Sequence, residues 1–342
     1  MLFLNDNSVR NNLFPLTHTR HTAQIRVGCF TIKQKWEILL GQEVFLSAAE
    51  NRVEVPANII PTKENFQKII ELASSKKSIA STDEIKCLKY PWHIFQLNDY
   101  AIRQDVNLIN KNNFNQKISP KNKTIDTQNI FVGSNVSMEH CFLNASTGLI
   151  IIDDNATLQE GAMIRGPFYL GKNSVVKMGA KIFGATTIGD NCTIGGEVKN
   201  SVVQDYSNKA HDGYLGDSVL GSWCNLGAGT SNSNIKNTAG DVMMQLSSSS
   251  EKINAGTKAG FIMGDYSRAA INTSFNTGTV VGVCCNVFGD NNPPKYINNF
   301  TWGKEQYDFE KAITHIKNWM TLKNKNITET EIEILKKVYS QR

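Results

Sequence analysis

The feature that most constrains this chain is a short repeat across residues 130–229, in which a small aliphatic residue precedes glycine. Leu170-Gly171 and Ile188-Gly189 lie eighteen residues apart, and Ile194-Gly195 follows six residues later. A six-residue period gives each hexad one flat face of a parallel β-helix, so three hexads make one triangular coil. The aliphatic side chain points inward, and glycine turns the corner without a Cβ clash. A β-sandwich would instead show a period of two, broken by turns.

Length and composition limit the classes of protein that fit. The 342 residues lead us to expect two domains, and the net charge of +5 suits a small anionic substrate as easily as nucleic acid. No apolar run approaches the roughly 20 residues of a membrane span, and the first residues lack the pattern of an export signal. Seven cysteines without CxxC spacing favour reduced thiols over a metal site. We therefore expect a cytoplasmic protein with no nucleic-acid or membrane partner.

The pattern changes along the chain predict four segments. Residues 1–109 mix short apolar strands with a helical pattern, which indicates a small α/β domain. Residues 110–123 are rich in Asn, Lys, Ser and Pro and read as a linker. The β-helix is expected over residues 124–292, and a helical extension over residues 293–342. The predicted fold class is thus mainly β.

Two polar stretches are expected to interrupt the coils, and two helices to end the chain. Residues 204–213, with His and Lys, are a place where a site could be mounted on a rigid scaffold, and residues 232–241 form a second excursion. Near the C-terminus, Thr328 and Glu331 make a capping box. One apolar stripe at helical spacing precedes that box, and we interpret it as packing: Phe309, Ile313, Ile316 and Met320.

Longer motifs in the repeat region carry a resemblance to a known family. Residues 209–217 read KAHDGYLGD, residues 224–230 read CNLGAGT, and residues 275–282 read FNTGTVVG. These motifs resemble the acetyltransferase half of bifunctional glucosamine-1-phosphate acetyltransferase/UDP-N-acetylglucosamine pyrophosphorylase, and more closely an alternative bacterial branch of it. The resemblance spans about residues 90–310 and, more faintly, residues 1–75. It implies a left-handed β-helix, a homotrimer, and N-acetylation of glucosamine-1-phosphate by acetyl-CoA in UDP-N-acetylglucosamine biosynthesis.

The chemistry of acetyl transfer to an amine assigns roles to the residues that match this family. A general base must take a proton from the amine, and the resemblance gives this role to His211. The tetrahedral oxyanion needs fixed amide donors, for which Asn234 and the backbone N–H of Ala228 match. Glu197 would orient or polarise the site. The alternatives are a loop histidine without a chemical role at His211 and an ordinary surface ion pair for Glu197 with Lys199.

The resemblance also implies contacts to the sugar phosphate and to the acyl donor. The family's phosphate-binding arginine falls on Lys181, which loses bidentate geometry, and Arg165 would compensate. The remaining residues that the resemblance places in the site bind substrate (Lys199, Tyr214, Asn225) or acetyl-CoA (Ala228, Thr277).

The N-terminal segment resembles sugar nucleotidyltransferases less completely. Residues 15–20 read PLTHTR, which is similar to the start of those enzymes, but the preceding loop lacks the glycines that cradle a triphosphate. The segment is also shorter than the family's domain. If nucleotidyl transfer survives, the resemblance implies Mg²⁺ as cofactor and the following residues: Arg10, Arg20 and Arg26 for nucleotide, Asn98 and Asp105 for metal.

Three functions therefore remain open. The first is an acetyl-CoA-dependent sugar-phosphate acetyltransferase, favoured by the motif around His211. The second is a sugar-1-phosphate nucleotidyltransferase, using UTP or dTTP, in which the β-helix serves oligomerisation. The third is a non-catalytic scaffold, for which the short N-terminal segment leaves room.

Overall fold

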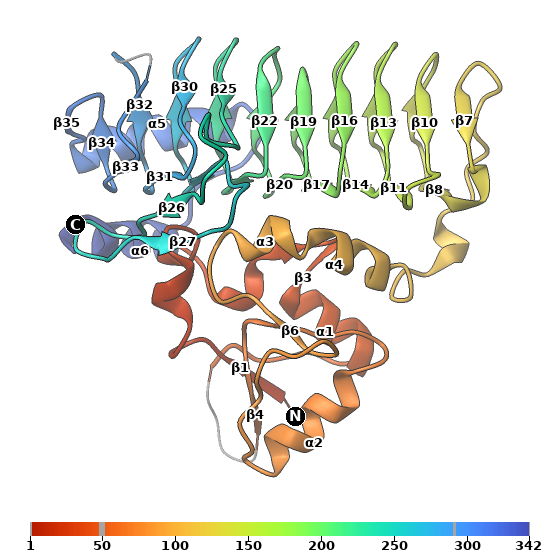
Figure 1. The fold of residues 1–342 in the computed structure, drawn as a ribbon, viewed down its shortest axis with the longest axis horizontal. Helices are drawn as coiled ribbons and strands as arrows, with labels where there is room; N and C mark the ends of the chain where they lie inside the picture. The colour runs from red at the N-terminus through yellow and green to blue at the C-terminus, as the bar shows by residue number, and fades with distance from the viewer. Residues whose placement is uncertain (1, 48–51, 290–291, 342) are drawn as a thin grey trace.

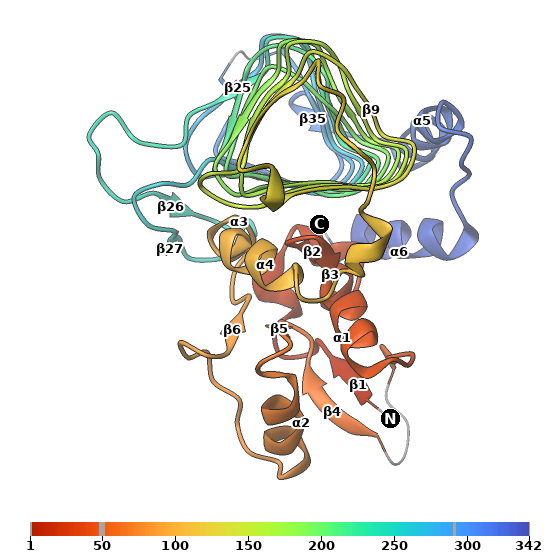
Figure 2. The same cartoon turned by 90° about the vertical axis from the view of Figure 1, so that its right-hand side faces the viewer.

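A triangular parallel β-helix forms one half of the computed structural model, and a small α/β domain lies under one of its faces (Figures 1 and 2). The structure describes residues 2–47, 52–289 and 292–341. Three parallel sheets stack coil upon coil, which confirms the predicted β-helix and the mainly β fold class. Aliphatic side chains from all three sheets fill the interior.

The three sheets are named here by the number of their strands. The nine-stranded face contains β8 (Ile130–Val132), β11 (Ile150–Ile152), β14 (Phe168–Leu170), β17 (Thr186–Ile188), β20 (Val202–Val203), β23 (Val219–Leu220), β28 (Phe261–Met263), β31 (Thr279–Val281) and β33 (Tyr296–Ile297). The ten-stranded face contains β9 (Ser137–Met138), β12 (Thr157–Leu158), β15 (Val175–Val176), β18 (Thr193–Ile194), β21 (Asn208–Lys209), β24 (Asn225–Leu226), β29 (Arg268–Ala269), β32 (Asn286–Val287), β34 (Thr301–Trp302) and β35 (Glu305–Gln306). The six-stranded face contains β7 (Lys123–Ile125), β10 (Phe142–Asn144), β13 (Met163–Arg165), β16 (Lys181–Phe183), β19 (Glu197–Lys199) and β22 (Tyr214–Gly216). Two further strands, β25 (Ser231–Asn232) and β30 (Ser274–Phe275), pair beyond β22.

The corner between the nine- and ten-stranded faces is built from residues in the left-handed backbone region. Asn135, Asn155, Asn173 and Asn191 take φ of 56–58° in four successive coils. Most side chains pay about 1–2 kcal/mol for this conformation, and asparagine tolerates it. The next three coils place aromatic residues there instead, Tyr206, Trp223 and Tyr266, and the rings of Tyr206 and Trp223 stack with their centroids 4.3 Å apart.

The interruption expected at residues 204–213 is a small one. This stretch contains β21 and leads into β22, but the corner between these strands is two residues longer than in the preceding coil. The inward position of β21 is filled by a side chain that is 2% exposed, Lys209. A longer segment leaves the prism between β25 and β28. It contains residues 232–241, where the second excursion was expected. It includes an antiparallel hairpin of β26 (Met243–Met244) and β27 (Ile253–Asn254).

The α/β domain combines paired short strands with four α-helices. Its strands are β1 (Leu2–Asn5) with β4 (Val53–Pro56), β2 (Arg26–Val27) with β3 (Phe30–Thr31), and β5 (Ile59–Ile60) with β6 (Lys86–Cys87). Its helices are α1 (Ile32–Leu40), α2 (Phe66–Ser74), α3 (His93–Gln96) and α4 (Asn98–Asp105). Short 3₁₀ helices lie at Arg10–Leu13, Leu16–His18 and Thr22–Gln24, and two more at Lys111–Asn113 and Thr127–Asn129.

The domain shares one hydrophobic core with the nine-stranded face. Val202, Val219, Ile262 and Val280 point outward from successive strands of that face and are fully buried among apolar residues of the domain. Polar bonds reinforce the seam, since the side chain of Gln204 pairs with both the N–H and the carbonyl of Arg26 at 2.9 and 3.0 Å. The domain is therefore fused to the prism rather than tethered by a linker.

Two C-terminal helices pack over the corner between the nine- and ten-stranded faces (Figure 2). They are α5 (Phe309–Thr321) and α6 (Glu329–Ser340), and the Thr328–Glu331 capping box is present as predicted. The stripe of α5 is buried against this corner, which confirms that it packs. Among the described residues, no helix is both long and apolar enough to cross a bilayer.

One buried ion pair in the α/β domain allows a test of this architecture. Lys35 Nζ bonds to Asp105 Oδ1, and both side chains are inaccessible to solvent. Lys35→Met leaves the carboxylate buried without its partner, so we expect the free energy of unfolding in urea to fall by about 3–5 kcal/mol. Lys33→Met, which breaks a partly exposed pair with Glu37 on the same helix, should cost no more than about 1 kcal/mol. Equal losses in the two variants would contradict this account.

Candidate functional site

The six-stranded face brings several of the predicted site residues together. Lys181, Glu197 and Tyr214 are direct neighbours in one outward row, because β16, β19 and β22 pair in register. Lys199 lies in the second outward row beside Phe183. Adjacent strands in such a ladder are about 4.8 Å apart, so these side chains form one continuous polar patch.

A hydrogen-bonded network closes this patch at its β22 end. The Asn234 side-chain amide donates to Asp217 Oδ2, and Asn200 Nδ2 donates to Asp217 Oδ1 at 2.6 Å. Asp217 is nearly fully buried, so the carboxylate fixes the orientation of both amides. Burial, followed by the charges of Asp217 and Glu197, raises the pKa of Tyr214 to about 12. The tyrosine side chain is therefore a neutral hydrogen-bonding group at physiological pH.

Gly216 is required by the same network. A Cβ at this position would lie 2.2 Å from Tyr214 Oη, so the phenol ring can only lie over a residue without a side chain. The Tyr214 ring therefore occupies the space that a side chain at position 216 of β22 would need. Any side chain at position 216 would move the Tyr214 hydroxyl out of the patch.

His211 lies at the corner between the ten- and six-stranded faces, on the coil that carries Tyr214. The equivalent corner of the preceding coil is two residues shorter, because Ile194 pairs with Lys209 and Glu197 pairs with Tyr214. The His211 side chain is exposed. Beneath it, Lys209 Nζ donates to the His211 carbonyl at 2.6 Å. Burial lowers the pKa of Lys209 to about 8, an effect that the nearby Asp212 carboxylate opposes.

Three predicted residues lie away from the six-stranded face. Asn225 points outward from the ten-stranded face, where it pairs in register with Asn208 and Arg268. Ala228 is exposed at the next corner of the prism. Thr277 is 1% exposed and bonds only to its neighbour Asn276, so its side chain is closed to a cofactor in this structure.

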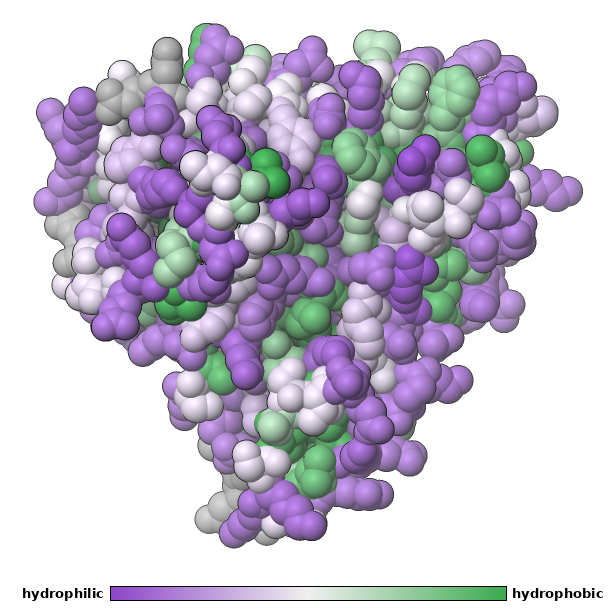
Figure 3. All heavy atoms as spheres, in the orientation of Figure 1, coloured by the Kyte–Doolittle hydropathy of each residue, from purple (hydrophilic) through white to green (hydrophobic). Residues whose placement is uncertain are grey.

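A shallow groove extends the patch toward the first coils. It has a volume of about 520 Å³ and includes Arg165 and Lys181 among its lining residues. Its floor also carries large exposed apolar side chains, with Ile125, Phe142 and Met163 exposed at 54, 50 and 48%. Figure 3 shows apolar side chains over β7 to β13 at the upper right of the molecule.

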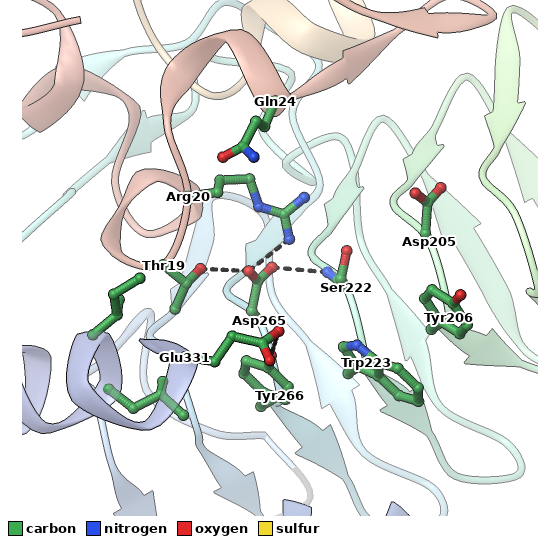
Figure 4. A pocket seen from close by; sticks show the side chains of 12 residues that line it. Thr19, Arg20, Gln24, Asp205, Tyr206, Ser222, Trp223, Asp265, Tyr266 and Glu331 are labelled. Atoms are coloured by element: carbon green, nitrogen blue, oxygen red, sulfur yellow. Dashed lines mark hydrogen bonds and ion pairs between the residues drawn. The ribbon is translucent and has the colours of Figure 1, made fainter. Parts of the chain in front are cut away.

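A second cavity of about 370 Å³ lies between the α/β domain, the aromatic corner and α6 (Figure 4). Arg20 reaches into it but pairs with Asp265, Nη2 to Oδ2, at 2.6 Å. Asp265 also accepts the Thr19 hydroxyl and the N–H of Ser222. Asp205 and Glu331 add two further carboxylates to the lining. Because Arg20 is already paired with Asp265 and the lining carries further carboxylates, this cavity is unfavourable for a phosphate chain.

The remaining arginines predicted to hold nucleotide are engaged in internal pairs. Arg10 binds Asp6 at 2.9 Å. Arg26 is 4% exposed and pairs with Asp205 at 3.0 Å and Asp190 at 3.4 Å. Together with Arg20, these arginines hold the chain together where a nucleotide was expected.

The two residues predicted to hold a metal, Asn98 and Asp105, also make internal bonds. Asn98 Oδ1 accepts the N–H of Gly28, and its amide donates to Ala185 across the seam. Asp105 accepts the N–H of Cys29 at 2.7 Å and pairs with Lys35. In the part of the chain that the structure describes, no cluster of His, Cys, Asp and Glu fit for a metal ion is present.

Sequence reasoning assigned no role to Asp217, Asn200 or Lys209, although the quoted motif contains two of them. Lys209 occupies an inward position that the repeat reserves for aliphatic residues, as Ile194 does one coil earlier. That break in the pattern was the available signal. Asn200 gave none, because its contact depends on how the corner folds.

Comparisons with known proteins find sequence similarity to sugar nucleotidyl transferases and to bifunctional proteins. A family model described as sugar nucleotidyl transferase matches residues 2–50 and 48–113. The bifunctional protein GlmU of Clostridium kluyveri is 33% identical over 142 residues, which cover 40% of this chain and 31% of that protein. A bifunctional sugar-1-phosphate nucleotidylyltransferase/acetyltransferase of Sulfurisphaera tokodaii is 26% identical over 235 residues, 64% of this chain and 51% of that protein.

The chain is GlmU-like. The GlmU of Synechococcus elongatus supports this with 27% identity over 230 residues, which cover 63% of this chain. The GlmU-like chain spans between about a third and a half of the length of these relatives. The activities in the names of these relatives are those of longer proteins.

The network around Tyr214 predicts a measurable electrostatic coupling. Glu197→Gln removes a negative charge that stabilises the neutral phenol, so the pKa of Tyr214 should fall from about 12 toward its ordinary value near 10. Titration of ¹³C-labelled tyrosine by NMR, with the resonance assigned by Tyr214→Phe, measures this shift. Glu43→Gln, at an exposed acid of the α/β domain, serves as control and should leave the resonance unchanged. An unchanged Tyr214 pKa in the Glu197→Gln variant would show that the two side chains are not electrostatically coupled.

Proposed function

We propose that this chain transfers the acetyl group of acetyl-CoA to the amine of glucosamine-1-phosphate. The observation that carries the proposal is the single patch on the six-stranded face that contains Glu197, Lys199, Tyr214 and Asn234, with His211 at its edge. A base, amide donors and a cation are what N-acetylation of a sugar phosphate requires. The similarity to proteins named as bifunctional acetyltransferases supports the same reaction.

Each side chain then has one task. The His211 imidazole accepts a proton from the substrate ammonium, which frees the amine to attack the thioester carbonyl. The tetrahedral intermediate then breaks its C–S bond, and CoA leaves as a thiol with the second proton that the nitrogen loses. Asn234 has two amide hydrogens, of which one is held by Asp217 and the other can meet the developing oxyanion. Lys199, Lys181 and Arg165 offer positive charge to the sugar phosphate along the face. Asn225 and the backbone of Ala228 would contact the ligands from the neighbouring face and corner.

A second candidate is nucleotidyl transfer by the α/β domain, with UTP or dTTP and Mg²⁺. The match to the sugar nucleotidyl transferase model over residues 2–113 favours it. The internal pairing of Arg10, Arg20 and Arg26 argues against it, because a triphosphate would have to displace a carboxylate from each. We therefore rank it below acetyl transfer, and the non-catalytic scaffold below both.

Assembly into a homotrimer is part of the proposal. Ile125, Phe142 and Met163 expose a row of apolar side chains on a face that the α/β domain does not cover. Packing of one prism against another would remove this surface from water and place a neighbour beside the patch. The same contact would explain why Asn225 and the six-stranded face do not meet within one chain.

The central test is the coupled assay of glucosamine-1-phosphate with acetyl-CoA, followed by UTP with the acetylated product. His211→Ala should lower kcat roughly 10²–10⁴-fold while acetyl-CoA affinity stays nearly unchanged. The acidic limb of the kcat/KM profile should disappear with it. Asn234→Ala should cost roughly 10²-fold or more, and Tyr214→Phe less.

The control for this test is His140→Ala, which changes an exposed histidine at the corresponding corner of an earlier coil. Its kcat should equal that of the wild type. Near-normal acetylation by His211→Ala would remove the proposed base, and pyrophosphate release in the UTP stage would raise the second candidate above the first.

The trimer is tested by placing a charge in the apolar row. Phe142→Glu should convert trimers to monomers in sedimentation at micromolar concentration, because a carboxylate cannot be buried unpaired at the contact. Leu322→Glu changes a side chain that is 75% exposed after α5 and should leave the trimer intact. A wild-type protein that sediments as a monomer would contradict the proposal directly.

A further inference from the structure

A buried arginine on the ten-stranded face has no acidic partner. Arg268 projects outward from β29 and is only 8% exposed, since α5 covers it. Its Nη1 donates to the carbonyl of Tyr266 at 3.3 Å. Its Nε and Nη2 are buried and have no hydrogen-bond partner. A charge removed from water in this state costs free energy unless an anion joins it.

The unpaired atoms form one edge of the guanidinium. Nε–H and Nη2–H point in nearly the same direction, which is the geometry that receives two oxygens of one carboxylate or phosphate group. The Trp319 ring lies 5.0 Å from Arg268 Cζ and holds the cation from the side of α5. The group is thus fixed in position, and the edge that recognises oxyanions is left vacant.

The surroundings of this arginine are cationic and neutral. Burial lowers the pKa of Arg268, and the groups that oppose this are Cys284, Tyr307 and Cys224, none of which is a carboxylate. Within the described residues, no acidic side chain lies in salt-bridge distance of Arg268 or of Lys323. The other arginines buried at the prism behave differently, since Arg20 and Arg26 each pair with aspartate.

A row of amides flanks Arg268 on the ten-stranded face. Asn208, Asn225 and Asn286 occupy the same outward row of the ten-stranded face, and all three are partly exposed. Lys323, which follows α5, donates to Asn208 Oδ1 at 3.3 Å and brings a second cation to this row. Amide donors beside two cations are a suitable lining for an anionic ligand.

We propose that the row of amides and Arg268 form a binding subsite for an oxyanion group, a phosphate or a carboxylate, held bidentately by the Nε–Nη2 edge beneath α5. This subsite lies on a different face from the His211 patch and does not depend on acetyl transfer. A phosphate ester and a carboxylate present the same pair of oxygens, so the probes must distinguish them.

The experiment is calorimetric titration of the full chain with inorganic phosphate and, separately, with acetate, at constant ionic strength. Wild type should bind one oxyanion at Arg268, and Arg268→Met should lose affinity by at least about tenfold, as expected for charge-assisted hydrogen bonds. Lys317→Met removes a charge from the exposed side of α5 and should bind as the wild type does. The stronger of the two probes identifies the class of ligand.

Two further measurements on Arg268 variants test the same subsite. Without anion, Arg268→Met should unfold at the same or a higher temperature than wild type, because it removes a buried charge that lacks a counter-ion. Arg268→Lys keeps the charge but cannot offer a planar edge, so its affinity should also fall. No phosphate or acetate binding to wild type in the millimolar range, or equal affinity in Arg268→Met, would show that water alone serves this edge and would overturn the proposal.

Discussion

The hydrogen-bonded register between successive coils is the constraint on which the rest of this structure depends. Once Lys181 is paired with Glu197 and Glu197 with Tyr214, the three side chains must share one row. The same register stacks four asparagines at one corner and four valine or isoleucine side chains on the nine-stranded face. The polar patch, the asparagine corner and the contact with the α/β domain therefore all follow from the register between successive coils.

The nine-stranded face explains why the α/β domain takes its present form. A prism whose outward row is apolar cannot leave that face in water, and the domain covers it. Arginines that would hold phosphates in a free nucleotidyltransferase domain instead reach across to Asp265 and Asp205. Two of the arginines expected to hold a nucleotide, Arg20 and Arg26, are thereby committed to the seam between domain and prism.

The sequence was sufficient for the parts of this molecule that repeat locally. The spacing of Leu170-Gly171 and Ile188-Gly189 predicted the β-helix, and the Thr328–Glu331 pair predicted the start of α6. The interruption expected at residues 204–213 is only a corner two residues longer than that of the preceding coil, because Lys209 fills the inward position and β21 keeps its place in the sheet.

What the sequence could not predict depends on contacts between distant segments. The pairing of Arg26 with Asp205 joins residues 179 positions apart. The proposed roles of His211 and Asn234 came from resemblance, and their placement relative to Asp217 required the fold. Asn225 illustrates the limit most clearly, since a motif places it in the site while the register turns it onto another face.

The shared core of domain and prism has a consequence for synthesis of the protein. Leu4 and Trp36 leave the ribosome well before Ile262 and Val280, yet all four residues belong to one hydrophobic cluster. The N-terminal segment cannot complete its interior until most of the chain has emerged. Through that interval its interior stays incompletely packed, and the last coils of the prism act as the closing layer of the α/β domain.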